Sequence, residues 1–143
     1  MGGNPPRRGA APRSELIALA ATERQLAGQR GEQLAALHLE QAGLHILMCN
    51  YRRRRTEIDI VAEDGEDLVI VEVRLRSSRR FGGGAGSVDA RKRRHLVVAA
   101  MQLLQQYPQF RRRRLRFDVV SLEPGECGHQ IEWIRHAFTA DGV

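Results

Sequence analysis

The fold of this chain is decided by residues 57–75, which read EIDIVAEDGEDLVIVEVRL. Two runs rich in Ile and Val, at 57–62 and 68–75, flank an acidic turn at 63–67 that contains a glycine. Runs of this length and composition are typical of β-strands, and so short a turn joins them into an antiparallel hairpin. Each strand also carries a carboxylate among its apolar residues, where an unpaired charge is costly.

The flanking sequence predicts two helices and three further strands. Good helix formers fill residues 29–42, with a looser helical extension before them, and Gly43 is suited to end that helix. Asp89 is suited to cap a second helix that runs to about Gln106, before Pro108. The further strands are predicted at 44–51, 114–122 and 131–135, with a charged turn at 52–55 and a loop at 77–87.

This order of elements predicts an α/β fold with one mixed central sheet flanked by helices. It reads helix, three-strand meander, helix and two strands, and the strand after the second helix can extend the sheet through a crossover. We expect one domain over residues 26–140. Residues 1–25 begin with Gly, Pro and Arg, and are predicted to be a flexible basic tail with partial helix. The apolar face of the first helix is predicted to comprise Leu34, Ala35, Leu37 and Ala42.

The bulk composition fits one globular domain that meets polyanions. The chain has 143 residues, a hydrophobic share of 42% and a net charge of +6 from 23 basic and 17 acidic side chains. Lys92 is the only lysine. The arginine bias has two readings, genome composition and phosphate recognition, and the count alone does not separate them.

The cysteines and the N-terminal sequence favour a cytoplasmic protein. Cys49 and Cys127 lie far apart without CxxC spacing, which argues against a zinc site and a disulfide framework. The N-terminal sequence holds no long apolar run, so neither a signal peptide nor a membrane helix is predicted.

Strand alternation predicts where the carboxylates point. Glu57 and Asp59 share one face of their strand, and Ile58 and Ile60 share the other. On the next strand, Glu72 lies on the face opposite its Val neighbours. If the hairpin register brings the two strand acids together, they form a pair of hard oxygen ligands.

A third carboxylate, Glu32, borders the apolar face of the first helix and approaches this pair. Convergence of Glu32, Asp59 and Glu72 would suit Mg²⁺ or Mn²⁺, which can polarise a phosphodiester and acidify a bound water. Structural roles remain open: a solvated Glu32, a hydrogen-bonded Asp59 and an ion pair between Glu72 and Arg74. Spacing alone favours these structural roles.

The whole pattern resembles the YraN family of small bacterial proteins. Matching runs extend in the same order over about residues 28–138: Gly31-Glu32-x-x-Ala35, Asn50-Tyr51-Arg52, Glu57-Ile58-Asp59-Ile60-Val61-Ala62, Val71-Glu72-Val73-Arg74-x-Arg76, Phe81-Gly82, Val88-Asp89, Lys92, Arg116-Phe117-Asp118-Val119-Val120 and Ile134-x-x-Ala137-Phe138. The resemblance implies a restriction-endonuclease-like domain of the PD-(D/E)XK type, similar to archaeal Holliday-junction resolvases. It therefore implies a nuclease acting on DNA, including branched DNA, and a homodimer.

Carried over residue by residue, the resemblance implies that Glu32, Asp59 and Glu72 are catalytic acids and metal ligands. The family's motif lysine is replaced here by Arg74, which stays protonated and cannot act as a general base. Arginine can still orient a water through a bound phosphate or stabilise charge in the transition state. Two functions therefore remain: a Mg²⁺- or Mn²⁺-dependent endonuclease, and an inactive nucleic-acid-binding module that keeps the nuclease fold.

Two arginine runs are candidate contacts for nucleic acid. Arg52, Arg53, Arg54 and Arg55 form one, and the other comprises Arg111, Arg112, Arg113 and Arg114. Solvated loops that aid solubility are the alternative reading, but the fold resemblance favours backbone binding. Phe81 beside four glycines and Lys92 on the second helix are further candidate contacts.

Overall fold

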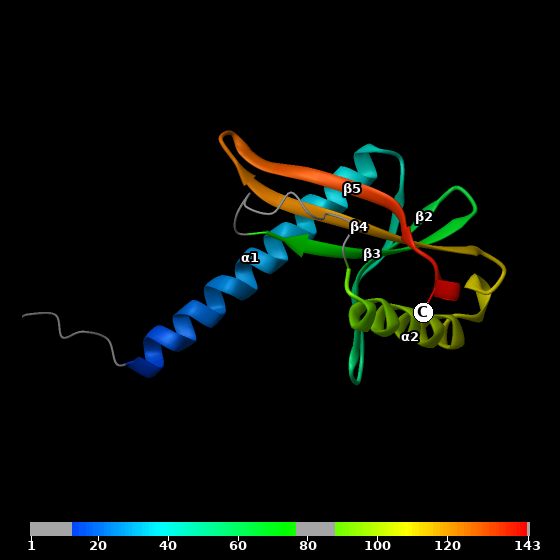
Figure 1. Cartoon of the computed structure of the whole chain (residues 1–143), viewed down its shortest axis with the longest axis horizontal. Coiled ribbons are helices and arrows are strands. Elements are labelled where there is room, and N and C mark those ends of the chain that lie inside the picture. The colour runs from blue at the N-terminus through cyan, green and yellow to red at the C-terminus, as the bar shows by residue number, and fades with distance from the viewer. Residues whose placement is uncertain (1–12, 77–87, 143) are drawn as a thin grey trace, which may run out of the picture.

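The computed structural model describes residues 13–76 and 88–142, which form two helices and a five-stranded sheet (Figure 1). In chain order these are α1 (Arg13–Gln41), β1 (His45–Arg53), β2 (Thr56–Asp64), β3 (Asp67–Leu75), α2 (Ala90–Gln106), β4 (Arg114–Gly125) and β5 (Gly128–Phe138). Short 3₁₀ turns lie at Pro108–Phe110 and Ala140–Gly142. No helix in the described ranges is long and apolar enough to cross a membrane.

The sheet is mixed, as predicted, and its spatial order follows the chain from β1 to β5. The first three strands form an antiparallel meander. β4 pairs in parallel with β3 after the crossover through α2, and β5 returns antiparallel to β4. The predicted α/β class and the order of elements are confirmed.

Helices α1 and α2 cover opposite faces of this sheet (Figure 1). On the α2 face, Leu96, Ala99, Ala100 and Leu103 of the helix pack against Ile70 and Phe117 among others. On the α1 face, a smaller cluster joins Ala35 and Leu39 to Val69, Val71 and Val120. Asp89 caps α2 as predicted, because its carboxylate accepts a hydrogen bond from Lys92 N at 2.8 Å.

Helix α1 differs from its prediction in length and in its buried stripe. It begins at Arg13, and its N-terminal half projects away from the sheet (Figure 1). The buried positions are Gly31, Ala35 and Leu39, which are spaced four apart along one side. The predicted apolar-face residues Leu37 and Ala42 are exposed instead, because the stripe that meets the sheet is centred on Ala35.

The last hairpin is longer than the sequence indicated. β4 continues to Gly125 and β5 begins at Gly128, whereas the final strand was predicted only at 131–135. Pro124, Gly125 and Gly128 lie outside both predicted strands, yet they belong to the strand ends that flank a tight turn. Gly128 has a φ of 106°, a value that glycine adopts without strain.

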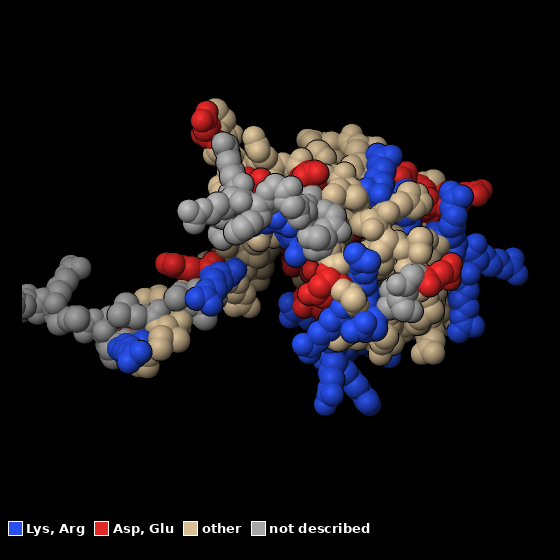
Figure 2. Space-filling view, viewed as in Figure 1, with Lys and Arg blue, Asp and Glu red and all other residues tan. Residues whose placement is uncertain are grey.

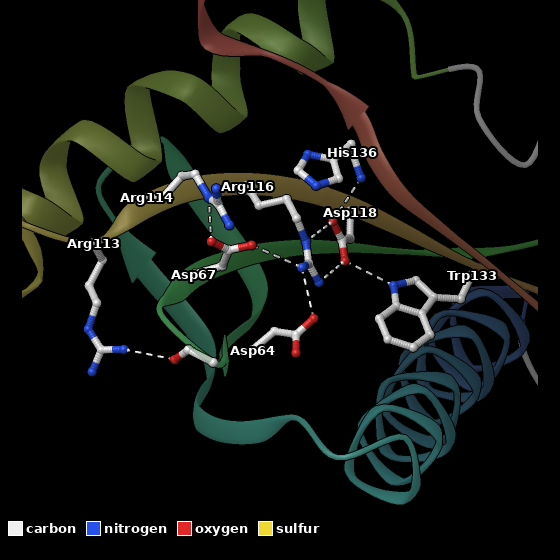
Figure 3. Close-up of polar contacts among 9 residues, drawn as sticks. Asp64, Asp67, Arg113, Arg114, Arg116, Asp118, Trp133 and His136 are labelled. Carbon is white, nitrogen blue, oxygen red and sulfur yellow. Dashed lines mark hydrogen bonds and ion pairs between the residues drawn. The ribbon is translucent and has the colours of Figure 1, made fainter.

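A buried guanidinium ties the closed end of the β2–β3 hairpin to β4 (Figure 3). Arg116 is only 5% exposed, and it donates two hydrogen bonds of 2.9 Å to the Asp118 carboxylate. It also contacts Asp64 at 2.8 Å and Asp67 at 3.3 Å. Asp118 accepts further hydrogen bonds from Trp133 Nε1 and the backbone of His136 in β5. The network thus joins four strands around three buried charged groups, Arg116, Asp67 and Asp118.

Replacing Arg116 by alanine should destabilise the protein strongly, because Asp118 would keep a buried charge without its guanidinium partner. The expected loss in the free energy of unfolding is on the order of 3–5 kcal/mol, measured by urea denaturation at neutral pH. Arg112→Ala is the matched control, since Arg112 is exposed and lies in the same segment. Its effect should stay within about 0.5 kcal/mol. Equal unfolding midpoints for the two variants would contradict a stabilising role of the network.

Candidate functional site

The candidate site forms where β2 separates from β3. The paired register of these strands runs from Asp64↔Asp67 to Ile60↔Val71 and ends there. One residue further along, the Asp59 carboxylate accepts a hydrogen bond of 2.8 Å from the backbone N–H of Val73. A side chain thus satisfies a donor that would otherwise need a neighbouring strand. This contact fixes the Asp59 carboxylate in the opening between the two strands.

The alternation of side chains breaks at the same level. Ile58 packs in the α2-side cluster and Ile60 in the α1-side cluster, so the prediction that they share a face is wrong. In β1, Asn50 lies between the pairs Cys49↔Ile60 and Tyr51↔Ile58 and has a φ of 55°. Asparagine tolerates this left-handed conformation better than most residues. The irregular backbone explains why a strict two-residue period fails here.

Three carboxylates gather at this irregularity. Glu32 from α1 and both Glu57 and Asp59 from β2 each offer an oxygen, and these oxygens lie within 4.8 Å of one another. We call Glu32, Glu57 and Asp59 the acid cluster. The sequence had placed Glu32 and Asp59 together but left Glu57 out of the site. Its spacing of two residues from Asp59 was the signal that could have included it.

Glu72 lies beside the acid cluster. It projects from β3 on the α2 face, where Lys92 Nζ contacts its carboxylate at 3.4 Å. Burial and, after it, the negative charge of the nearby Asp59 raise the pKa of Glu72. Of the predicted site acids, Glu32 and Asp59 therefore meet directly, while Glu72 faces Asp59 from the next strand under a lysine.

Burial raises the pKa of several of these carboxyl groups. Burial first, and then the charge of Asp59, raise the pKa of Glu72 to about 7 against an opposing effect of Lys92. Burial also raises the pKa of Asp59, while the hydrogen bond from Val73 lowers it. The pKa of Glu32 is raised by burial and then by Asp59. Added positive charge at this place would relieve the repulsion among them.

Two cationic side chains adjoin Glu72. Arg74 follows it on the same face of β3, and its charge opposes the rise in the pKa of Glu72. Arg74 pairs across the parallel ladder with Ser121, whose buried hydroxyl has no hydrogen-bond partner in the described ranges. Lys92 lies in the first turn of α2, positioned by the Asp89 cap. The predicted nucleic-acid contact Lys92 is thus close to the carboxylates.

The two arginine runs lie at opposite ends of the strands. The run at 52–55 comprises the last two residues of β1 and the β1–β2 turn, and Arg52 Nε contacts Glu57 of the acid cluster at 3.2 Å. The run at 111–114 leads into β4 and ends at Arg114, which is level with Asp67, five residues from Glu72. That separation is about 17 Å along a strand. Phe81, the predicted aromatic contact, lies outside the described residues.

Two arginines of the run at 111–114 form ion pairs within the fold. Arg113 contacts Glu63 at 3.0 Å, and Arg114 contacts Asp67 at 2.6 Å (Figure 3). These partners lie on the hairpin between β2 and β3, more than 45 residues away in sequence. The charges of this run are therefore partly neutralised within the fold.

Comparison with protein-family models identifies the family of the chain. A family model described as "Uncharacterised protein family UPF0102" matches residues 31–122. The chain belongs to the UPF0102 family. The matched span includes Glu32, Glu57, Asp59, Glu72, Arg74 and Lys92. This membership agrees with the resemblance to YraN-like proteins.

Curated UPF0102 proteins cover most of the chain. The protein of Alkalilimnicola ehrlichii is 44% identical over 115 residues, covering 80% of this chain and 88% of its own length. The protein of Dechloromonas aromatica is 46% identical over 114 residues, with coverage of 80% and 89%. The protein of Xanthomonas oryzae pv. oryzae is 49% identical over 120 residues, with coverage of 82% and 95%. Each carries the UPF0102 name, which assigns no activity.

The raised pKa of Glu72 predicts how the stability of this UPF0102 chain changes with pH. Between the ordinary value of 4.5 and about 7, the folded chain holds a proton at Glu72 that the unfolded chain releases. The free energy of unfolding should therefore fall as pH rises through this window and level off above it. In the Glu72→Gln variant, the decrease in the free energy of unfolding between pH 4.5 and pH 8 should be smaller by on the order of 1–3 kcal/mol. Urea denaturation in metal-free buffer at the two pH values measures this difference.

The control for this prediction is Glu126→Gln, in the exposed turn between β4 and β5. It should follow the wild-type pH dependence. Parallel curves for all three proteins would show that Glu72 titrates alike in the folded and unfolded chains.

Proposed function

We propose that this chain binds nucleic acid and hydrolyses phosphodiester bonds of DNA with the aid of Mg²⁺ or Mn²⁺. The observation that carries the proposal is the acid cluster, in which oxygens of Glu32, Glu57 and Asp59 lie within 4.8 Å of one another. This concentration of negative charge occurs in a chain of net charge +6. Carboxylates gathered in a basic protein are suited to hold a divalent cation, and this cation can in turn contact a phosphate of the nucleic acid.

The donor set fits a hard divalent cation. Every candidate ligand is a carboxylate oxygen, which Mg²⁺ and Mn²⁺ prefer over the nitrogen or sulfur ligands that zinc sites use. Glu32, Glu57 and Asp59 would hold the ion, with Glu72 across the opening next to Asp59. A bound ion supplies charge neutralisation of the phosphate and an acidified water.

The cationic side chains have separate tasks in this proposal. Arg74 holds the phosphate by charge and hydrogen bonds, since a guanidinium that stays protonated cannot take a proton from water. Lys92 holds the Glu72 carboxylate at 3.4 Å and fixes its position. The restriction-endonuclease-like, PD-(D/E)XK assignment belongs to this proposal, supported by strand acids on β2 and β3 of a mixed sheet. Branched DNA as substrate, a homodimer and a cytoplasmic location complete it.

Cleavage should depend on both the metal and Asp59. Single-stranded, duplex and branched DNA are incubated with Mg²⁺, Mn²⁺ or EDTA, and products are resolved on denaturing gels. Asp59→Asn removes one ligand charge with little change in volume and should lower the rate by about 10²-fold or more. Glu66→Gln, in the exposed β2–β3 turn, is the matched acid control and should cleave like wild type.

Metal binding can be read without turnover. Mg²⁺ or Mn²⁺ should raise the melting temperature of the wild-type protein and of Glu66→Gln, and the rise should be smaller for Asp59→Asn. Binding of DNA without cleavage of any substrate in either metal would favour the inactive binding module over the nuclease.

Arg74 offers a further test of the mechanism. Arg74→Lys should keep or raise the cleavage rate, because it restores the lysine of the resembled motif at the same strand position. Arg74→Ala should lower the rate by about 10²-fold or more, the scale for losing one preorganised contact to the transition state. Full cleavage by Arg74→Ala on the same substrates would rule out this role for Arg74.

A further inference from the structure

A basic groove runs between the β1–β2 turn and α2. We call it the α2 groove, and the residues that line it are Arg54, Arg55, Thr56, Arg91, His95, Val98 and Gln102. Figure 2 shows Lys and Arg atoms gathered at the bottom of the view, where this turn passes α2. Only the β1–β2 half of this surface was apparent from the arginine run in the sequence.

Side-chain hydrogen bonds hold the two walls of the α2 groove together. Tyr51 Oη donates to Gln106 Oε1 at 2.7 Å, and the Thr56 hydroxyl donates to the side chain of Gln102. Both contacts join the β1–β2 hairpin to α2. The walls are therefore fixed before a ligand arrives, which lowers the entropy that binding must overcome.

The charges of the α2 groove are uncompensated. Arg54, Arg55 and Arg91 are exposed, and none of them forms an ion pair within the described ranges. Arg113 and Arg114 of the second run are instead paired with Glu63 and Asp67. Free guanidinium groups release counterions when they meet phosphates, whereas paired groups must first give up a carboxylate.

Neighbours of the α2 groove residues in the chain contact the site carboxylates. Arg52, which lies at the end of β1 two residues before Arg54, contacts Glu57 of the cluster at 3.2 Å. On the other wall, Arg91 precedes Lys92, which contacts Glu72 at 3.4 Å. A polynucleotide with one phosphate at the carboxylates would thus place neighbouring phosphates over this groove.

From these observations we infer that the α2 groove binds the phosphate backbone of duplex DNA next to the acid cluster, and that the run at 111–114 contributes little. The inference rests on the proposed function, because it names where that function's substrate lies. Arg54, Arg55 and Arg91 each contact a phosphate oxygen. Because backbone contacts carry no sequence information, the groove binds duplexes of different sequence alike.

The test compares two triple variants with equal changes in net charge. The groove variant is Arg54→Gln, Arg55→Gln, Arg91→Gln, and the control variant is Arg112→Gln, Arg113→Gln, Arg114→Gln. Binding to a fluorescent duplex oligonucleotide is measured by anisotropy in EDTA over a series of salt concentrations. A third protein with lysine at positions 54, 55 and 91 keeps the charge and controls for folding, which is checked by thermal unfolding.

The groove variant should lose affinity by about 10-fold or more at low salt, and its log–log salt slope should shrink by about 2 to 3. The affinity of the control variant should fall by less than about 3-fold. Its three arginines are expected to attract DNA only at long range, and salt screens that attraction. The lysine protein should bind within a few-fold of wild type. This pattern supports the groove whether or not the wild type cleaves DNA.

Other outcomes separate the two proposals. Equal losses in the two triple variants would overturn the groove and leave general charge attraction as the cause of binding. Unchanged affinity of the groove variant would overturn it as well. If the binding pattern is as expected but no metal-dependent cleavage is seen, the groove is supported and the proposed hydrolysis is overturned. If the wild-type protein binds no duplex at low salt, both proposals are overturned.

Discussion

The hydrogen bond from the backbone of Val73 to the Asp59 carboxylate is the contact on which the candidate site depends. It allows β2 to leave β3 without stranding a buried donor, because a side chain takes the place of the missing strand. Where β2 leaves β3, the alternation of side chains along β2 is broken, so that Ile58 and Ile60 pack on opposite faces of the sheet. It also opens the space in which Glu32, Glu57 and Asp59 approach one another.

The two ends of the β2–β3 pair are held by opposite electrostatic arrangements. At the hairpin end, Arg116 forms ion pairs with three aspartates and ties the strands to β4. At the open end, burial raises the pKa of Asp59 and Glu72, and Lys92 offsets only part of their charge. The sheet is thus secured by arginine–aspartate ion pairs where it is closed, whereas at its open end the carboxylates lie close together with fewer cationic partners.

Much of this architecture follows from local sequence rules. The Ile- and Val-rich runs gave the meander, Asp89 gave the start of α2, and helix periodicity placed Glu32 near the strand acids. The break at Asp59 could not be predicted, because the alternation rule assumes a regular pleat. The different fates of the two arginine runs were equally hidden, since Glu63 and Asp67 reach Arg113 and Arg114 only through the folded sheet. Local patterns specify elements, whereas partners distant in sequence decide which charges remain available.

The backbone of β1 has a consequence for the outer border of the sheet. β1 is an edge strand, and a regular edge offers unpaired N–H and C=O groups to any extended chain that meets it. The left-handed residue Asn50 and the register shift between Ile46 and Met48 interrupt that row of groups. Arg52 and Arg53 then place exposed charges at its end. The distortion that accompanies the acid cluster therefore also protects this border against strand-to-strand aggregation.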